Sequence, residues 1–167
     1  MLSKAFNLAV KEWEWLKDNP VSRVQKEREN NEVDRWLAED EERRLLGNSP
    51  DWLREIIVFA LNTGLRQDEL LSLEWSRVNL LRKTIIIQKT KNNKPNTLPL
   101  NSIVLNILMQ KYESKVRSLK NDLVFSSQSG TKIGKRNLIR AFAQALEKAE
   151  IKDFTFHCLR HTFATRL

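Results

Sequence analysis

The sequence predicts a mainly helical domain with one small antiparallel β-sheet, an α+β fold. Glycine and proline number only 4 each among 167 residues, which favours long helices with short connections over a turn-rich β fold. Apolar residues recur at helical spacing in most segments, and one β-branched run precedes a turn. Hydrophobic residues make up 41% of the chain, which is enough to build a buried core.

The first 34 residues divide into a helix and a polar stretch. Residues 22–34 contain almost no apolar side chains, as is typical of a linker. Before them, Asn19-Pro20 ends a predicted amphipathic helix with a helically spaced apolar face (Leu2, Phe6, Ala9, Trp13 and Leu16). We therefore expect the first helix to belong to a different unit from the rest of the chain.

Three helices are predicted between residues 36 and 73. The first is charged and is flanked by apolar side chains (Trp36, Leu37, Leu45 and Leu46). Pro50 then leads into a strongly apolar helix, WLREIIVFALNTG, which Gly64 closes because glycine accepts the left-handed backbone common just after a helix. A short helix follows over residues 68–73.

The segment TIIIQ, residues 84–88, is β-branched and short, which predicts a strand. The tip KTKNNK and the segment TLPL complete a hairpin. Pro99 lies where its second arm should end, since proline donates no hydrogen bond to a sheet.

The rest of the chain is predicted to be helical apart from LVF at residues 123–125, which suits a short strand or an extended segment. Asn101 caps a helix that runs to about Lys115. Thr155 caps the last helix, FHCLRHTFATRL. Between them, residues 135–149 form a helix with one apolar side (Leu138, Phe142, Ala145, Leu146 and Ala149).

The net charge of +8 and the pI near 9.8 favour a polyanionic partner, with nucleic acid first and an anionic membrane surface second. Cys158 is the sole cysteine, so no internal disulfide can form and a reducing compartment fits. No apolar run approaches the roughly 20 residues of a membrane span. We expect a soluble, cytoplasmic protein.

Three basic groups are candidates for a site. Arg66 follows the glycine that closes the apolar helix, so its backbone is held and its side chain can be aimed; the plain alternative is a solvated loop arginine. Lys91 stands at the hairpin tip, where a lysine can reach a phosphate, although charged hairpin turns are common. His157, Arg160 and His161 share one helical face.

The pair His157 and His161 also has a zinc-ligand spacing. Zinc fits poorly, because the metal-protease glutamate is missing, no further histidine exists and Cys158 points to another face; a packed histidine pair is the alternative. The sequence also lacks a phosphate-cradling Gly-x-x-x-x-Gly-Lys-Ser/Thr loop and carboxylates spaced for two metals. Phosphoryl chemistry here would rely on arginine, lysine and histidine, without a metal ion.

Together these segments resemble the tyrosine recombinase (phage integrase) family. TGLRQDELLSLEWSRV is similar to that family's first catalytic box, KTKNNKPNTLPL to its lysine-bearing hairpin, and FHCLRHTFATRL to its His-x-Leu-Arg-His-Thr/Ser-Phe-Ala-Thr box. AFNLAVKEWEWLKDNPV resembles the last helix of the family's core-binding domain. The resemblance covers nearly the whole chain, with the boxes in the family's order.

The resemblance implies DNA integration or site-specific recombination, as in phages and other mobile elements, with double-stranded DNA as partner. A tyrosine attacks one strand and forms a 3′-phosphotyrosine link, so no high-energy cofactor is needed. By motif position, the catalytic residues are Arg66, Lys91, His157 and Arg160. The arginines clamp the phosphate, Lys91 protonates the leaving oxygen and His157 assists proton transfer.

Two supporting residues are also implied: Glu69, which orients the first arginine, and His161, which stands behind the site. By the same resemblance, residues 1–20 form the last helix of a core-binding (SAM-like) domain, 21–34 a linker and 35–167 a catalytic domain. The full-length relatives act as tetramers.

This sequence departs from the family pattern in two ways. The family's nucleophilic tyrosine follows the last box, but here the only tyrosine, Tyr112, precedes it, and we expect it to be a packing or surface residue. We therefore expect a catalytic domain cut before its nucleophile, which binds DNA without cleaving it. Ala38 stands where the family commonly has a helix-capping threonine.

Two other classes of function stay open on the sequence alone. A non-catalytic basic DNA-binding module would bind the DNA backbone in a salt-dependent way without needing Arg160. A basic helical protein-interaction domain would show no affinity for DNA even at low salt. The integrase interpretation differs from both because it requires Arg66, Lys91, His157 and Arg160 to meet on one surface.

Overall fold

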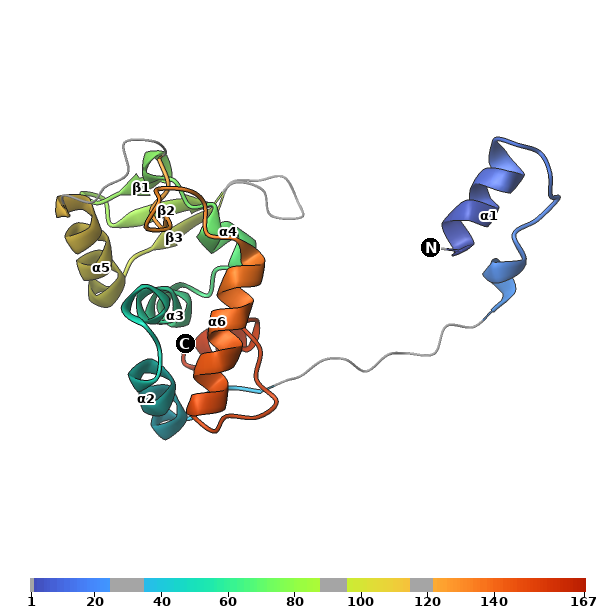
Figure 1. Ribbon diagram of the computed structural model, residues 1–167. Helices are drawn as coiled ribbons and strands as arrows, with labels where there is room; N and C mark the ends of the chain where they lie inside the picture. The colour runs from blue at the N-terminus through green and yellow to red at the C-terminus, as the bar shows by residue number, and fades with distance from the viewer. Residues whose placement is uncertain (1, 25–34, 88–95, 115–121) are drawn as a thin grey trace. The chain divides into compact units, whose positions relative to one another are not determined.

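The computed structural model describes residues 2–24, 35–87, 96–114 and 122–167 (Figure 1). The chain forms two compact units, Met1–Glu32 and Val33–Leu167. The second unit is mainly helical with one three-stranded antiparallel sheet, so the predicted fold class is confirmed. None of the helices in the described ranges has the length and apolar character needed to cross a membrane.

The first unit contains helix α1 (Leu2–Lys11) and the 3-10 helix η1 (Pro20–Arg23). α1 ends at Lys11, earlier than the predicted end at Asn19-Pro20. The Trp13 and Trp15 amides donate to the Leu8 and Ala9 carbonyls and close the helix, and Glu14 has a positive φ of 50°. Trp13 and Leu16 are both partly exposed, so no burial favours a longer helix.

Asn19 organises the turn after α1. Its side-chain oxygen accepts from the Val21 amide at 2.9 Å, which caps η1. Its side-chain nitrogen donates to the Ser3 carbonyl at 3.0 Å and to Asn7 Oδ1 at 2.7 Å. Both polar atoms of this buried side chain form hydrogen bonds. Asn19 therefore holds the start of η1 against α1.

In the second unit, α2 (Glu39–Gly47) is followed by α3 (Asp51–Thr63) and α4 (Gln67–Leu71). Ala38 precedes α2 and has no side-chain oxygen to cap it. The Glu41 carboxylate still accepts from the Ala38 amide at 3.1 Å. This is one of the two hydrogen bonds of a capping box; a threonine side chain would supply the other. Gly64 ends α3 in the left-handed conformation, as predicted, with φ 60° and ψ 18°.

The sheet has strand order β1-β2-β3 and is antiparallel throughout. The 3-10 helix η2 (Trp75–Arg77) leads into β1 (Val78–Asn79), which pairs with β2 (Thr84–Ile87). β2 pairs with β3 (Asn96–Pro99), where Thr84 faces Pro99. The predicted hairpin and the place of Pro99 are confirmed; β1 was not predicted, since two residues carry no alternation.

The last three helices are α5 (Ser102–Glu113), α6 (Lys135–Lys148) and α7 (Cys158–Thr165). Asn101 caps α5 as predicted, by accepting from the Val104 amide at 2.9 Å. The predicted Thr155 cap of α7 is wrong. The Thr155 carbonyl accepts from the Cys158 amide at 3.0 Å in a turn, so α7 begins later, with His157 at its N-cap.

Helix α3 forms the centre of the second unit. It packs against α5, α6 and α7, and lies between α5 and α6 in Figure 1. More than half of its side chains are buried, and its Phe59 ring meets Phe125 edge-on at 5.0 Å. Since α3 is held on several sides, the turn at its C-terminal end has a fixed position.

Candidate functional site

Arg66 is presented by the turn that follows α3. Its amide donates to Glu69 Oε2 at 2.8 Å and its Nη1 donates to Glu69 Oε1 at 3.0 Å. One carboxylate therefore fixes both the backbone and the guanidinium of Arg66. Half of the Arg66 side chain stays exposed, while Glu69 is mostly covered. This arrangement leaves the remaining guanidinium donors available to an external anion.

Helix α7 brings the last basic group to the same turn. Arg160 Nη1 donates to the Gly64 carbonyl, two residues before Arg66 in the chain. The Phe163 ring, one helical turn further on, packs directly on Gly64. A Cβ at Gly64 would lie 2.3 Å from Phe163 Cδ1, so only glycine permits this approach. Residues 94 positions apart in sequence thus share one corner of the fold.

Two histidines of α7 lie beside the arginines at this corner. The His157 and His161 rings lie 5.0 Å apart and meet nearly at right angles. Desolvation lowers the pKa of His157 below its ordinary value, and the charges of His161, Arg160 and Arg66 lower it further. The influence of Arg66 on His157 indicates that α4 and α7 contribute to one electrostatic environment.

Lys91 lies outside the described residues. The strands that lead to its hairpin, β2 and β3, are described and pair in register from Thr84 with Pro99 to Ile87 with Asn96. The remaining predicted residues are placed: the structure brings Arg66, Glu69, His157, Arg160 and His161 to the junction of α3, α4 and α7.

Tyr112 lies on α5 and is about half exposed. Its ring meets that of Trp75 edge-on, with centroids 5.5 Å apart. It is therefore a packing residue at the surface, as the sequence predicts.

The described part of the chain contains no group of three or more His, Cys, Asp and Glu side chains placed to hold a metal ion. The His157 and His161 pair therefore lacks a third ligand among those residues. Arginines beside the pair also disfavour a cation there.

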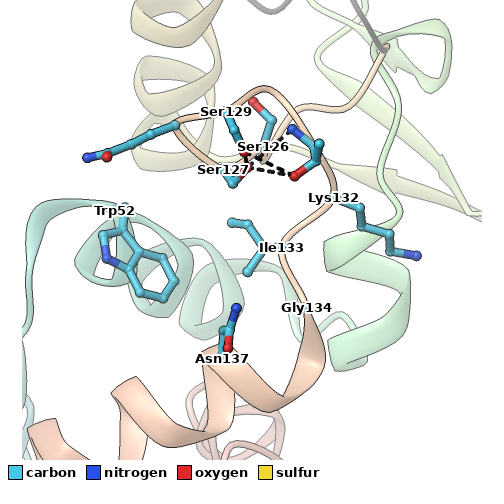
Figure 2. A pocket seen from close by; sticks show the side chains of 10 residues that line it. Trp52, Ser126, Ser127, Ser129, Lys132, Ile133, Gly134 and Asn137 are labelled. Carbon is cyan, nitrogen blue, oxygen red and sulfur yellow. Dashed lines mark hydrogen bonds between the residues drawn. The ribbon is translucent and has the colours of Figure 1, made fainter.

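A separate cleft of about 590 Å³ lies between the start of α3, the loop before α6 and the first turn of α6 (Figure 2). Trp52, Ile133 and Asn137 line it together with a run of hydroxyl side chains. The Ser127 hydroxyl bonds to those of Ser129 and Thr131, at 2.9 Å each, so these groups mainly close the loop on itself. Among the predicted site residues that the structure describes, none lines this cleft.

Two interactions near the site were not predicted from the sequence, a salt bridge and a hydrogen bond. Lys135, at the start of α6, pairs with Asp68 of α4 at 2.6 Å, next to Arg66. Thr162 of α7 is fully buried and bonds to the backbone of Leu37 at 2.9 Å. A threonine within an apolar helical face could have indicated the bond of Thr162. Nothing in the sequence indicates that the exposed charges of Lys135 and Asp68 pair with each other.

Comparison with known proteins identifies similar chains. Residues 35–167 match the phage integrase family. An integrase of Salmonella phage P22 is 32% identical over 95% of this chain and 43% of its own length. A shufflon-specific DNA recombinase of Escherichia coli is 31% identical over 99% of this chain and 41% of its own length. The chain thus spans less than half the length of these relatives.

A similar fold occurs in the structure of the Tn1549 transposon integrase in complex with circular intermediate DNA. The TM-score is 0.73 at 22% identity, over 99% of this chain and 62% of that one. At this identity the likeness concerns the fold.

Proposed function

The chain belongs to the phage integrase family, and we propose from that premise that it carries the phosphate-binding part of a DNA breaking and rejoining site. The substrate is double-stranded DNA, and the reaction is site-specific recombination through a 3′-phosphotyrosine link. The observation that carries the proposal is the contact of Arg160 with the Gly64 carbonyl, which places both arginines at one turn.

Two guanidinium groups suit the chemistry of a phosphodiester. Negative charge grows on the non-bridging oxygens as a nucleophile attacks phosphorus, and arginine donates to such oxygens in a planar fork. Arg66 keeps free donors because Glu69 engages only part of its guanidinium. Glu69 acts as the residue that orients Arg66 and limits the rotamers that it samples.

Proton transfer is assigned to His157 and Lys91. A lowered pKa favours a neutral His157 ring at neutral pH, which can accept a proton from an attacking hydroxyl. Lys91, on the hairpin between β2 and β3, would protonate the leaving 5′-oxygen. His161 packs against the His157 ring and supports its orientation.

The nucleophile is assigned to a tyrosine that is not among residues 1–167. The sequence has one tyrosine, Tyr112, whose ring is engaged with Trp75 on α5. We therefore expect the 167-residue chain to form no covalent adduct with a nicked suicide substrate. A covalent protein–DNA band that disappears in Tyr112→Phe would contradict this assignment.

The proposal extends to domain organisation and assembly. Residues 1–20 would be the last helix of a core-binding (SAM-like) domain, residues 21–34 a linker and residues 35–167 the catalytic domain. A longer protein of this family would assemble as a tetramer on DNA. A DNA substrate and a buried Cys158, the sole cysteine of the sequence and so unable to form an internal disulfide, both suit the cytoplasm.

Binding of the chain to a short labelled duplex tests the function through fluorescence anisotropy over a range of salt concentrations. Loss of a charge-assisted hydrogen bond costs about 1.5–3 kcal/mol, so Arg66→Gln and Arg160→Gln should each weaken binding roughly tenfold or more. Arg43→Gln, which removes the same charge from an exposed arginine on α2, should change it less than about twofold.

The same experiment separates the competing function. A non-catalytic DNA-binding module would bind with a similar salt dependence, and Arg160→Gln would then weaken binding no more than Arg43→Gln. Absence of binding at low salt would contradict both DNA-binding interpretations and favour a protein-interaction domain.

A further inference from the structure

Thr162 is the one polar residue of α7 whose side chain is completely buried, at 0% exposure. Its hydroxyl donates to the Cys158 carbonyl at 2.8 Å, within the helix. It also accepts from the Leu37 amide at 2.9 Å, across 125 positions of sequence. A bond within the helix is common for threonine, but the bond to Leu37 fixes this helix against another segment.

That segment is residues 35–38, called the strap here, which precedes α2. Both backbone polar groups of Leu37 are used by α7: its amide donates to Thr162 and its carbonyl accepts from Arg166 Nη2 at 3.1 Å. Arg166 Nη1 also pairs with Glu42 of α2 at 2.6 Å. The Leu37 side chain is only 2% exposed, so the strap is held by burial as well.

Helix α7 is therefore held on two faces. Positions two apart on a helix differ by roughly 200° in direction, so Arg160 and Thr162 point to opposite sides. Arg160 contacts the turn at Gly64, whereas Thr162 contacts the strap. Helix α7 has only 8 residues and packs along α3, so the bonds of Arg160 and Thr162 add a polar contact to each of two opposite faces.

We propose that Thr162 is a positioning residue of the phosphate site, which acts by holding α7 on the strap so that His157 and Arg160 face Arg66. This inference rests on the proposed function, because it names the site as one that binds a phosphate. Loss of the hydroxyl leaves the Gly64 contact in place but lets α7 turn about it. The buried Leu37 amide then also lacks its partner, which favours displacement of the strap.

The test uses the 167-residue chain and inorganic phosphate, with the imidazole resonances of its two histidines as readout. In the unchanged chain, phosphate should shift the His157 resonance along a saturable curve. Thr162→Val keeps the shape but removes the hydroxyl, and should weaken phosphate binding roughly three- to tenfold, the size expected for one lost hydrogen bond. Thr162→Ser, which keeps the hydroxyl, should restore binding to within about twofold.

A second variant covers the case in which Thr162→Val does not fold. Arg166→Lys keeps the charge but cannot bond Leu37 and Glu42 at the same time, and 39% of the Arg166 side chain is exposed. It should weaken phosphate binding in the same direction. The matched control is Arg54→Lys, since Arg54 also bonds backbone carbonyls and a carboxylate, but on α3 and away from the strap. It should leave binding unchanged.

The outcomes distinguish the two proposals. If phosphate leaves the His157 resonance unmoved in the unchanged chain, the proposed function fails. If phosphate binds there with the same affinity in folded Thr162→Val and in Arg166→Lys, the positioning role of Thr162 is wrong while the proposed function stands. Equal weakening in Arg54→Lys would also overturn it, because the effect would then not depend on the strap.

Discussion

Gly64→Ala should destabilise the second unit strongly, because two penalties act at one atom. An alanine at φ 60° adopts the left-handed region, which costs about 1–2 kcal/mol. Its Cβ would lie 2.3 Å from Phe163 Cδ1 and 2.8 Å from Phe163 Cε1. Because carbon atoms normally rest about 3.5–4.0 Å apart, the ring must move by roughly 1 Å or more.

Overpacking of this kind typically costs about 1–3 kcal/mol, so the sum is about 2–5 kcal/mol. A domain is stable by only about 5–15 kcal/mol, so the change should be large in any unfolding experiment. Phe163 and Arg160 lie on the same short helix, so a shift of the helix that moves the ring away from residue 64 also disturbs the Arg160 bond to its carbonyl. Phosphate binding should therefore weaken together with stability.

Urea unfolding followed by circular dichroism measures the effect, with Gly47→Ala as the matched control. Nothing lies within 4 Å of a Cβ at Gly47 and this residue ends α2, so its replacement should be neutral or stabilise by up to about 1 kcal/mol. In the Gly64→Ala background, Phe163→Ala should cost less than it does alone. A free energy of unfolding for Gly64→Ala within about 0.5 kcal/mol of that of the unchanged chain, or additive effects of the two substitutions, would contradict this prediction.

Three further outcomes are expected. Glu69→Gln should weaken phosphate binding several-fold with little loss of stability. Glu69→Asp should bind phosphate about as weakly, because its shorter side chain cannot reach both groups of Arg66. A phosphate affinity equal to that of the unchanged chain, measured by isothermal titration, would contradict this. Because the pKa of His157 is lowered in the folded chain, the unfolded chain takes up a proton at a higher pH than the folded one does. The free energy of unfolding should therefore fall as the pH decreases from neutral. His157→Gln should remove this part of the pH dependence of the urea midpoint. Asp68→Asn should change stability by less than about 1 kcal/mol, because its bridge to Lys135 is largely exposed, and a larger loss in thermal unfolding would show that the bridge holds α4 to α6.

The sequence predicted a helix and its ends well where the residues of that segment themselves determine them. Helix α3 and its glycine end follow from an apolar run and one residue that tolerates positive φ. Asn101 likewise caps α5 with its own side chain. Helix α1 was overestimated because the apolar spacing of Trp13 and Leu16 continues beyond the point where backbone bonds turn the chain. Periodicity describes a face, but it does not show whether anything covers that face.

The candidate site was predicted from motif position, and its assembly was not predictable from the sequence. Arg66 and Arg160 come together through the contact of Phe163 with Gly64 and through a guanidinium bond to a backbone carbonyl. A backbone carbonyl has no sequence identity, so no pattern indicates it. The partner of Thr162, the Leu37 amide, is also a backbone group, so the sequence can indicate a buried threonine but not the group that it bonds.

The central claim is that Arg66, His157 and Arg160 surround one phosphate. Crystals of the chain soaked with tungstate, a strongly scattering tetrahedral anion that imitates phosphate, test it most directly. We expect a single anion within hydrogen-bond distance of both guanidinium groups and of the His157 ring. An anion held by one arginine alone, with the other two side chains directed to separate surfaces, would contradict it.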